Sequence, residues 1–154
     1  MNTVNEKTAE VLNDLIQINN DRVTGYEKAS KEAANTDVDL KALFMTMATE
    51  SRGYVTELSK WLAGSGKEPT NSTTTKGKIY RTWMDVKATF TGKDRKAILA
   101  SCEFGEDAAQ KAYDEALATD AELTTEVRQL IANQKQSLRK SHDKIKAMRD
   151  AQPA

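Results

Sequence analysis

The side chains in this sequence that are best suited to chemistry are glutamates, because histidine and cysteine each occur only once. Glu50 and Glu106 lie in segments whose apolar residues recur at helical spacing. Two carboxylates on facing helices can hold a hard metal ion. The single histidine, His142, excludes a two-histidine metal site within one chain, and the single cysteine, Cys102, excludes an intramolecular disulfide.

Helices must position these residues. Apolar side chains at spacings of three and four predict four long helices and one short one. The long helices are expected at about 5–34, 37–63, 94–118 and 121–149, and the short one at about 78–91. Capping patterns of threonine followed three residues later by an acid begin at Thr36, Thr91 and Thr119. Residues 64–77 are rich in Gly, Ser and Thr and predict a loop.

The lengths of the connections predict the topology. The links near residues 36 and 120 are short, so each forces its two helices to run antiparallel. Residues 64–92 are long enough to return along the bundle, so the second and third long helices should run parallel. The prediction is an all-α, ferritin-like four-helix bundle, in which two antiparallel hairpins are joined by a long crossover. The whole chain, 1–154, is expected to form one domain.

Charge and hydropathy narrow the function classes. Lys and Arg together number 23 and so do Asp and Glu, so no net charge attracts nucleic acid or an anionic membrane. The sequence has no apolar N-terminal segment and no apolar run long enough to span a bilayer. We therefore expect a soluble, cytoplasmic protein with neither nucleic acid nor membrane as a partner.

Counting along the expected helices brings several polar residues to one height. Glu50, Glu106, Asn19 and Gln134 should form a layer in the middle of the bundle, with Arg22 beside it. A di-iron bundle site takes a Glu from each of two helices and a Glu-x-x-His motif from each of the other two. The motif positions here read Glu-Ser-Arg-Gly from Glu50 and Gln-Lys-Gln-Ser from Gln134, so both histidines are missing.

Four interpretations of this layer remain open. The sequence favours a buried hydrogen-bond network in which Arg22 forms an ion pair with Glu50. A second is a single Mg²⁺, Ca²⁺ or Mn²⁺ ion held by Glu50 and Glu106 with water. A redox-active iron site is the third, and a pocket for a small ligand is the fourth.

His142 and Cys102 form a second region of interest. His142 should lie at the height of Glu27 and within about one turn of Cys102. The simpler interpretation is a hydrogen-bonded pair of His142 and Glu27, and the alternative is a metal or redox site. Cys102 lies on the apolar stripe of its helix, so we expect a buried, unreactive thiol.

Three stretches of the sequence resemble a known family. They are VLNDLIQINNDRVTGYEKA at 11–29, TWMDVKATFTGKDRKAILASCEFGEDAAQKAYDEAL at 82–117 and SHDKIKAMRD at 141–150. They are similar to small bacterial four-helix-bundle proteins with a ferritin-like fold, a family described as a domain of unknown function. The resemblance covers nearly the whole chain. It implies the fold and a bacterial source, but no substrate.

Two functions follow as hypotheses. The leading one is a non-enzymatic bundle that self-associates, with a dimer favoured, or binds a protein partner through exposed aromatic residues such as Tyr80 and Trp83; a stress response is one setting for it. The alternative is a metal-binding protein with a reduced carboxylate site for iron or manganese. That site would use Glu50 and Glu106, with Glu27 and His142 as a second polar patch.

Overall fold

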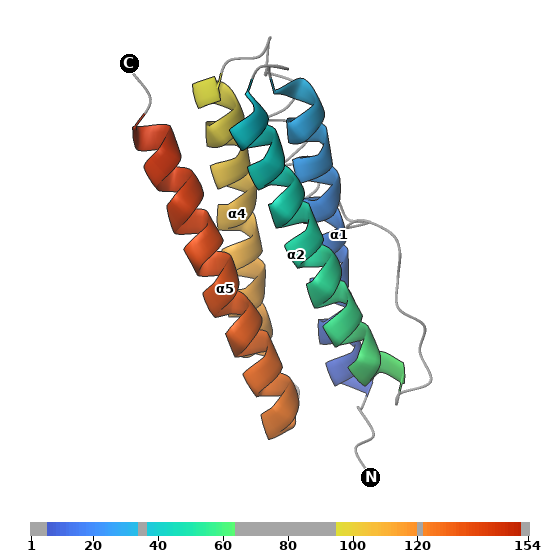
Figure 1. The fold of residues 1–154 in the computed structure, drawn as a ribbon. Helices are drawn as coiled ribbons and strands as arrows, with labels where there is room; N and C mark the ends of the chain where they lie inside the picture. Colours follow the sequence, from blue (N-terminus) through green and yellow to red (C-terminus); the bar gives the residue numbers. More distant parts are fainter. Residues whose placement is uncertain (1–5, 34–36, 64–94, 120–121, 152–154) are drawn as a thin grey trace.

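Four long helices make up the described part of the chain (Figure 1). The computed structural model describes residues 6–33, 37–63, 95–119 and 122–151. The helices are α1 (Glu6–Glu32), α2 (Val38–Leu62), α4 (Arg95–Leu117) and α5 (Thr125–Asp150). No strand occurs within these ranges, so the predicted all-α bundle is confirmed. The expected short helix at 78–91, with Tyr80 and Trp83, lies outside the described residues, as do the loop at 64–77 and the capping residues Thr36 and Thr91.

The helix directions match the predicted pair of hairpins. In Figure 1, α1 and α5 run upward, whereas α2 and α4 run downward. An ion pair of 2.7 Å joins Arg95, the first residue of α4, to Asp37, the residue that caps α2. The parallel arrangement of α2 and α4 is therefore fixed where both helices begin. Helix α1 packs against α2 and α4, and α5 packs against α4, while α2 and α5 touch less closely.

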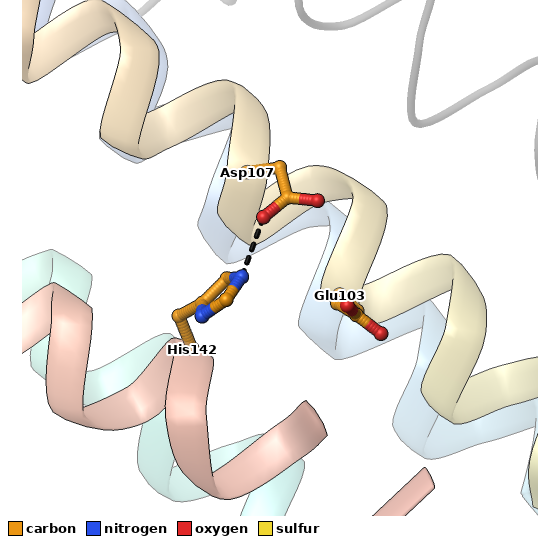
Figure 2. A group of neighbouring side chains, drawn as sticks. All are labelled: Glu103, Asp107 and His142. Carbon is orange, nitrogen blue, oxygen red and sulfur yellow. Dashed lines mark hydrogen bonds and ion pairs between the residues drawn. The ribbon is translucent and has the colours of Figure 1, made fainter. Parts of the chain in front are cut away.

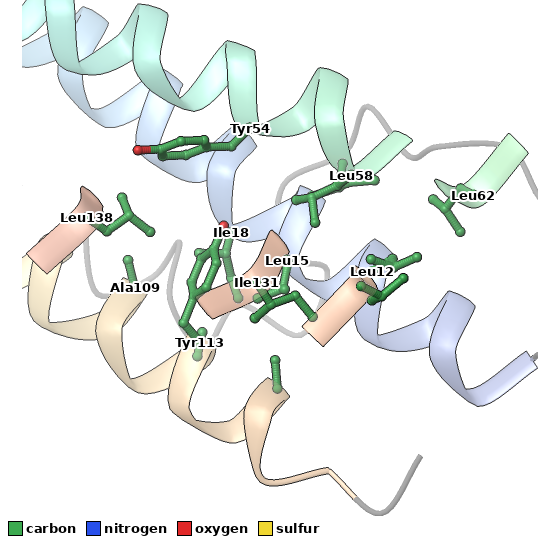
Figure 3. Close-up of a cluster of buried hydrophobic side chains, with 14 of the residues drawn as sticks. Leu12, Leu15, Ile18, Tyr54, Leu58, Leu62, Ala109, Tyr113, Ile131 and Leu138 are labelled. Carbon is green, nitrogen blue, oxygen red and sulfur yellow. The ribbon is translucent and has the colours of Figure 1, made fainter. Parts of the chain in front are cut away.

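The core has two apolar clusters with a polar layer between them. The first cluster fills one end of the bundle with residues such as Leu12, Leu58, Tyr113 and Ile131 (Figure 3). The second fills the other end and includes Phe44, Leu99, Cys102 and Ile145. Burial of these side chains supplies most of the driving force for packing the four amphipathic helices together. Each helix carries polar residues at the height where the two clusters meet, and these residues form the candidate site.

One helix boundary was predicted wrongly. Helix α5 begins at Thr125 rather than near 121, and its N-cap is Thr124, whose hydroxyl accepts a hydrogen bond of 3.2 Å from the Val127 N–H. The expected cap at Thr119 is wrong, because residues 122–124 are not helical. The other helix ends lie within two residues of their predicted positions. Asp37, next to the predicted Thr36, caps α2 by accepting from the Leu40 N–H at 3.3 Å.

Within residues 6–33, 37–63, 95–119 and 122–151, none of the four helices is long and apolar enough to cross a bilayer.

Candidate functional site

Arg22, on α1, is the centre of the buried polar layer. Its guanidinium forms an ion pair with Glu106 of α4 through Nε, with Nη2 at 3.3 Å from the second carboxylate oxygen. Nη1 lies 3.0 Å from Oε1 of Glu50 on α2 and donates to Ser51 Oγ at 2.8 Å. Arg22 and Glu106 are each about 1% exposed. The predicted ion pair between Arg22 and Glu50 is therefore confirmed, and the second partner of Arg22 is Glu106.

A chain of hydrogen bonds extends this layer across the bundle. The Ser51 hydroxyl donates to Asn19 Oδ1 at 2.9 Å, and Asn19 Nδ2 donates to the Tyr113 hydroxyl at 2.9 Å. Tyr113 in turn donates to Gln134 Oε1 at 2.6 Å, and Gln134 Nε2 donates to the carbonyl oxygen of Tyr54 at 3.4 Å. Both hydroxyls accept one bond and donate another, so the donors and acceptors match in one direction. All four described helices contribute to this network.

The electrostatics of the layer keep Arg22 charged and the phenols neutral. Burial by itself lowers the pKa of Arg22, but the negative charge of Glu106 raises it, and the net result lies above the usual value. Burial raises the pKa of Glu106, and the Arg22 charge acts in the opposite direction. Burial also raises the pKa of Tyr113, and it raises the pKa of Tyr54 to about 12. The guanidinium therefore remains a permanent cation between two carboxyl groups.

The position of Arg22 decides what the layer can bind. Glu50 and Glu106 were the expected metal ligands, and the bundle does bring them together. The Arg22 guanidinium pairs with both, so a metal ion at this point would have to displace it. Displacement would leave a buried arginine without its carboxylate partners, which costs several kcal/mol. The arrangement serves as a structural ion-pair network more readily than as a metal site.

Gln134 lies about two turns away from its expected place. The counting placed it opposite Glu106, but it contacts Tyr113, seven residues further along α4. The α5 residue beside Glu50 is Ser141, whose hydroxyl donates to Oε1 at 3.1 Å. Helix α5 begins at Thr125, four residues later than expected, which moves Gln134 in this direction by about one of the two turns. Gln134 still joins Asn19 through Tyr113, as their similar predicted heights required.

His142 and Glu27 do not form the expected pair. His142 Nε2 lies 2.5 Å from Asp107 Oδ1, and Nδ1 lies 3.1 Å from Asp143 Oδ1. Glu27 instead forms an exposed ion pair with Arg52 between α1 and α2. Among the described helices, α1 packs against α2 and α4 and not closely against α5, so Glu27 lies away from His142.

Cys102 is fully buried, as predicted. Burial also raises the pKa of its thiol well above the usual value, which suits an unreactive core residue.

A cluster that the sequence reasoning missed surrounds His142. Glu103 and Asp107, on α4, and His142, on α5, each offer one ligand atom, and these atoms all lie within 4.8 Å of one another (Figure 2). The available signal was the spacing of four between the two acids, which places both on one face of a helix. That signal is weak alone, and the wrong register for α5 hid the histidine.

A groove lies along the α2–α5 seam. Its volume is about 280 Å³, and its lining residues are Leu43, Thr46, Met47, Glu50, Ser137, Lys140, Ser141 and Lys144. Glu50, whose side chain is 29% exposed, connects this groove to the Arg22 layer. Water can therefore reach one edge of the layer.

Fold and site together define a class: a four-helix bundle whose apolar core is crossed by a buried arginine–glutamate layer. The comparison of sequences gives the family. Residues 7–120 match the family described as Domain of unknown function (DUF2383), and the chain belongs to it. The matched range includes Arg22, Glu50 and Glu106, and it ends before α5. A search of curated proteins found no match.

Proposed function

We propose that this protein is a non-enzymatic, ferritin-like bundle of the bacterial cytoplasm that acts by binding, either to a second copy of itself or to a protein partner. The observation that carries the proposal is the pairing of Arg22 with Glu106 and Glu50. Within the layer the charged side chains form ion pairs with one another, and the amides and hydroxyls form hydrogen bonds with one another. The side chains of the layer that could have taken part in catalysis therefore stabilise the bundle, and we infer that the functional residues lie on its surface.

Trp83 and Tyr80, the aromatic candidates from the sequence, are the residues through which we propose that the protein associates. Aromatic side chains contribute disproportionately to protein interfaces. Sedimentation velocity of the full chain should show a dimer that Trp83→Ala weakens at least tenfold and that Trp83→Phe retains. A wild-type monomer that captures no partner, or an assembly indifferent to Trp83→Ala, would contradict this assignment.

The second candidate function is iron or manganese binding by Glu50 and Glu106. Its support is the groove that reaches Glu50 from the surface. It requires Arg22 to swing away from both carboxylates. Elemental analysis of protein purified without chelators or an affinity tag tests it directly. Stoichiometric Fe or Mn that disappears in Glu106→Gln would establish this function, and metal-free protein that ignores added Fe²⁺ and Mn²⁺ would eliminate it.

A further inference from the structure

The cluster of Glu103, Asp107 and His142 has the geometry of a metal site, outside the Arg22 layer. The two acids are one turn apart on α4, and the histidine reaches them from α5 (Figure 2). Ligand atoms within 4.8 Å of one another need only small rotations to bind one ion at about 2.0–2.2 Å each. The set combines one imidazole nitrogen with two carboxylate oxygens from two helices.

A fourth residue orients the histidine. His142 Nδ1 lies 3.1 Å from the Asp143 carboxylate, which suits donation of the Nδ1 proton to that oxygen. Histidines that bind metals usually donate their other ring N–H to a carboxylate or carbonyl group, and this fixes the tautomer. Nε2, the nitrogen left to act as a ligand, then points to Asp107. The arrangement is more specific than a group of surface acids.

Burial differs among the three ligands in a useful way. His142 and Glu103 are buried, so the protein holds their side chains in place. The Asp107 side chain is 60% exposed and can adjust to an ion. Its exposure also gives the ion a path from solvent and leaves room for water as a further ligand.

The charge around the imidazole is negative. Three carboxylates, those of Glu103, Asp107 and Asp143, lie at the cluster. Arg149 forms an ion pair with Glu103, and Arg139 lies 3.3 Å from Asp143. With the Nδ1 proton directed at Asp143, Nε2 and the Asp107 carboxylate face each other as two electron-pair donors, so a cation placed between them gains two ligands.

We propose that Glu103, Asp107 and His142 bind a divalent transition-metal ion of the Zn²⁺ class, with water completing the coordination. Imidazole favours Zn²⁺ over Mg²⁺ or Ca²⁺, which prefer sites built of oxygen alone. The ion enters between Nε2 and Asp107, and Glu103 moves from Arg149 to the metal. Because the ligands come from α4 and α5, the bound ion links these two helices and stabilises the hairpin that they form.

Zn²⁺ titration of the untagged full chain tests the proposal. Calorimetry should give one site per chain, and thermal unfolding should shift upward by about 5–10 °C at Zn²⁺ concentrations 100-fold above Kd. His142 is the sole histidine, so its imidazole NMR signals report binding without ambiguity. Asp107→Asn, an exposed substitution, should abolish the saturable site.

Asp114→Asn is the matched control. Asp114 is also an exposed acid on α4 that contacts α5, through Lys135 at 3.0 Å, but it lies outside the cluster. This variant should bind Zn²⁺ as the wild type does. Loss of binding in both aspartate variants to the same extent would mean nonspecific attraction of cations to acidic surface, and would overturn the proposal.

Two further variants test the roles of the individual groups. Arg149→Gln frees Glu103 from its competing partner and should tighten Zn²⁺ binding severalfold. His142→Gln should remove the site, and Asp107→Asn decides the question if His142→Gln does not fold. Absence of saturable Zn²⁺ binding in the wild type, or full binding in Asp107→Asn, contradicts the proposal.

Discussion

The Arg22 layer and the His142 cluster use similar groups in opposite ways. Glu106 and Asp107 are neighbours in sequence, but Glu106 points into the core and Asp107 points toward solvent beside α5. In the core, where an unpaired carboxylate costs several kcal/mol, the cation that compensates Glu106 is the side chain of Arg22. In the His142 cluster the Asp107 side chain is 60% exposed, so water screens its charge and an ion can exchange there. The exposure of Asp107, rather than residue type, separates the proposed binding site from the structural layer.

The largest effect is expected from Glu106→Gln, which tests the buried side of this comparison. The amide keeps the shape of the carboxyl but removes its charge, and Arg22 cannot lose its own charge in response. We expect a loss of about 3 kcal/mol in unfolding free energy, the lower end of the range for broken buried ion pairs, because Glu50 still pairs with Arg22. Urea unfolding followed by circular dichroism measures it.

Glu27→Gln is the matched control for that substitution. The pair of Glu27 and Arg52 also joins two helices, but its side chains are 41% and 47% exposed. Exposed pairs contribute little, so we expect a loss below about 1 kcal/mol. Equal losses in the two variants would show that burial does not distinguish them.

Alkaline pH should destabilise the buried layer by ionising the tyrosines in it and beside it. Burial raises the pKa of Tyr26, Tyr54 and Tyr113, that of Tyr54 to about 12, above the usual 10.0. Their contribution to stability is therefore fully present below pH 10 and falls as the pH rises above 10, through about 12 for Tyr54, since the unfolded chain ionises first. Absorbance at 295 nm should show these phenols ionising together with the loss of helix. Independent ionisation of three of the four tyrosines near pH 10, with helicity intact, would contradict the assignment.

Tyr113→Phe probes the uncharged half of the layer. It removes the hydroxyl that joins Asn19 to Gln134, and leaves the oxygen of Gln134 without that donor. We expect a loss of about 1–2 kcal/mol in unfolding free energy, measured in urea. Gln129→Ala, which removes an exposed bond to Asn133, should change stability by less than about 0.5 kcal/mol. A change in Tyr113→Phe no larger than in this control would show that the network adds nothing.

The sequence predicted the fold well because the relevant signals are local. Apolar periodicity located all four described helices, and short links determined the antiparallel pairs. The register between α1 and α2 was also right, since Arg22 meets Glu50 as the counting required. The start of α5 was predicted wrongly because Thr119 has an acid three residues later, whereas Thr124, the actual cap, is followed at that spacing by Val127.

The same error decided which parts of the site could be predicted. Residues on α1, α2 and α4 came together as expected around Arg22. Gln134 and His142, on α5, were each given the wrong partner, and Asp107 was not considered. Contacts between helices depend on their register, and four further linker residues shift that register by about one turn. A buried polar layer can be predicted despite such an error, because each helix shows it separately as polar residues inside an apolar stripe. The His142 cluster has no such signal.

The smallest effect is expected from Asp107→Asn in metal-free protein. Its contact with His142 lies at the surface, so its loss should change the unfolding free energy by less than about 1 kcal/mol. Urea unfolding with a chelator present measures it. A loss as large as that of Glu106→Gln would mean that the cluster, like the Arg22 layer, holds the fold together. A small loss without metal, together with a larger difference from the wild type when Zn²⁺ is present, would mean that the outer acids serve binding while the inner ones serve stability.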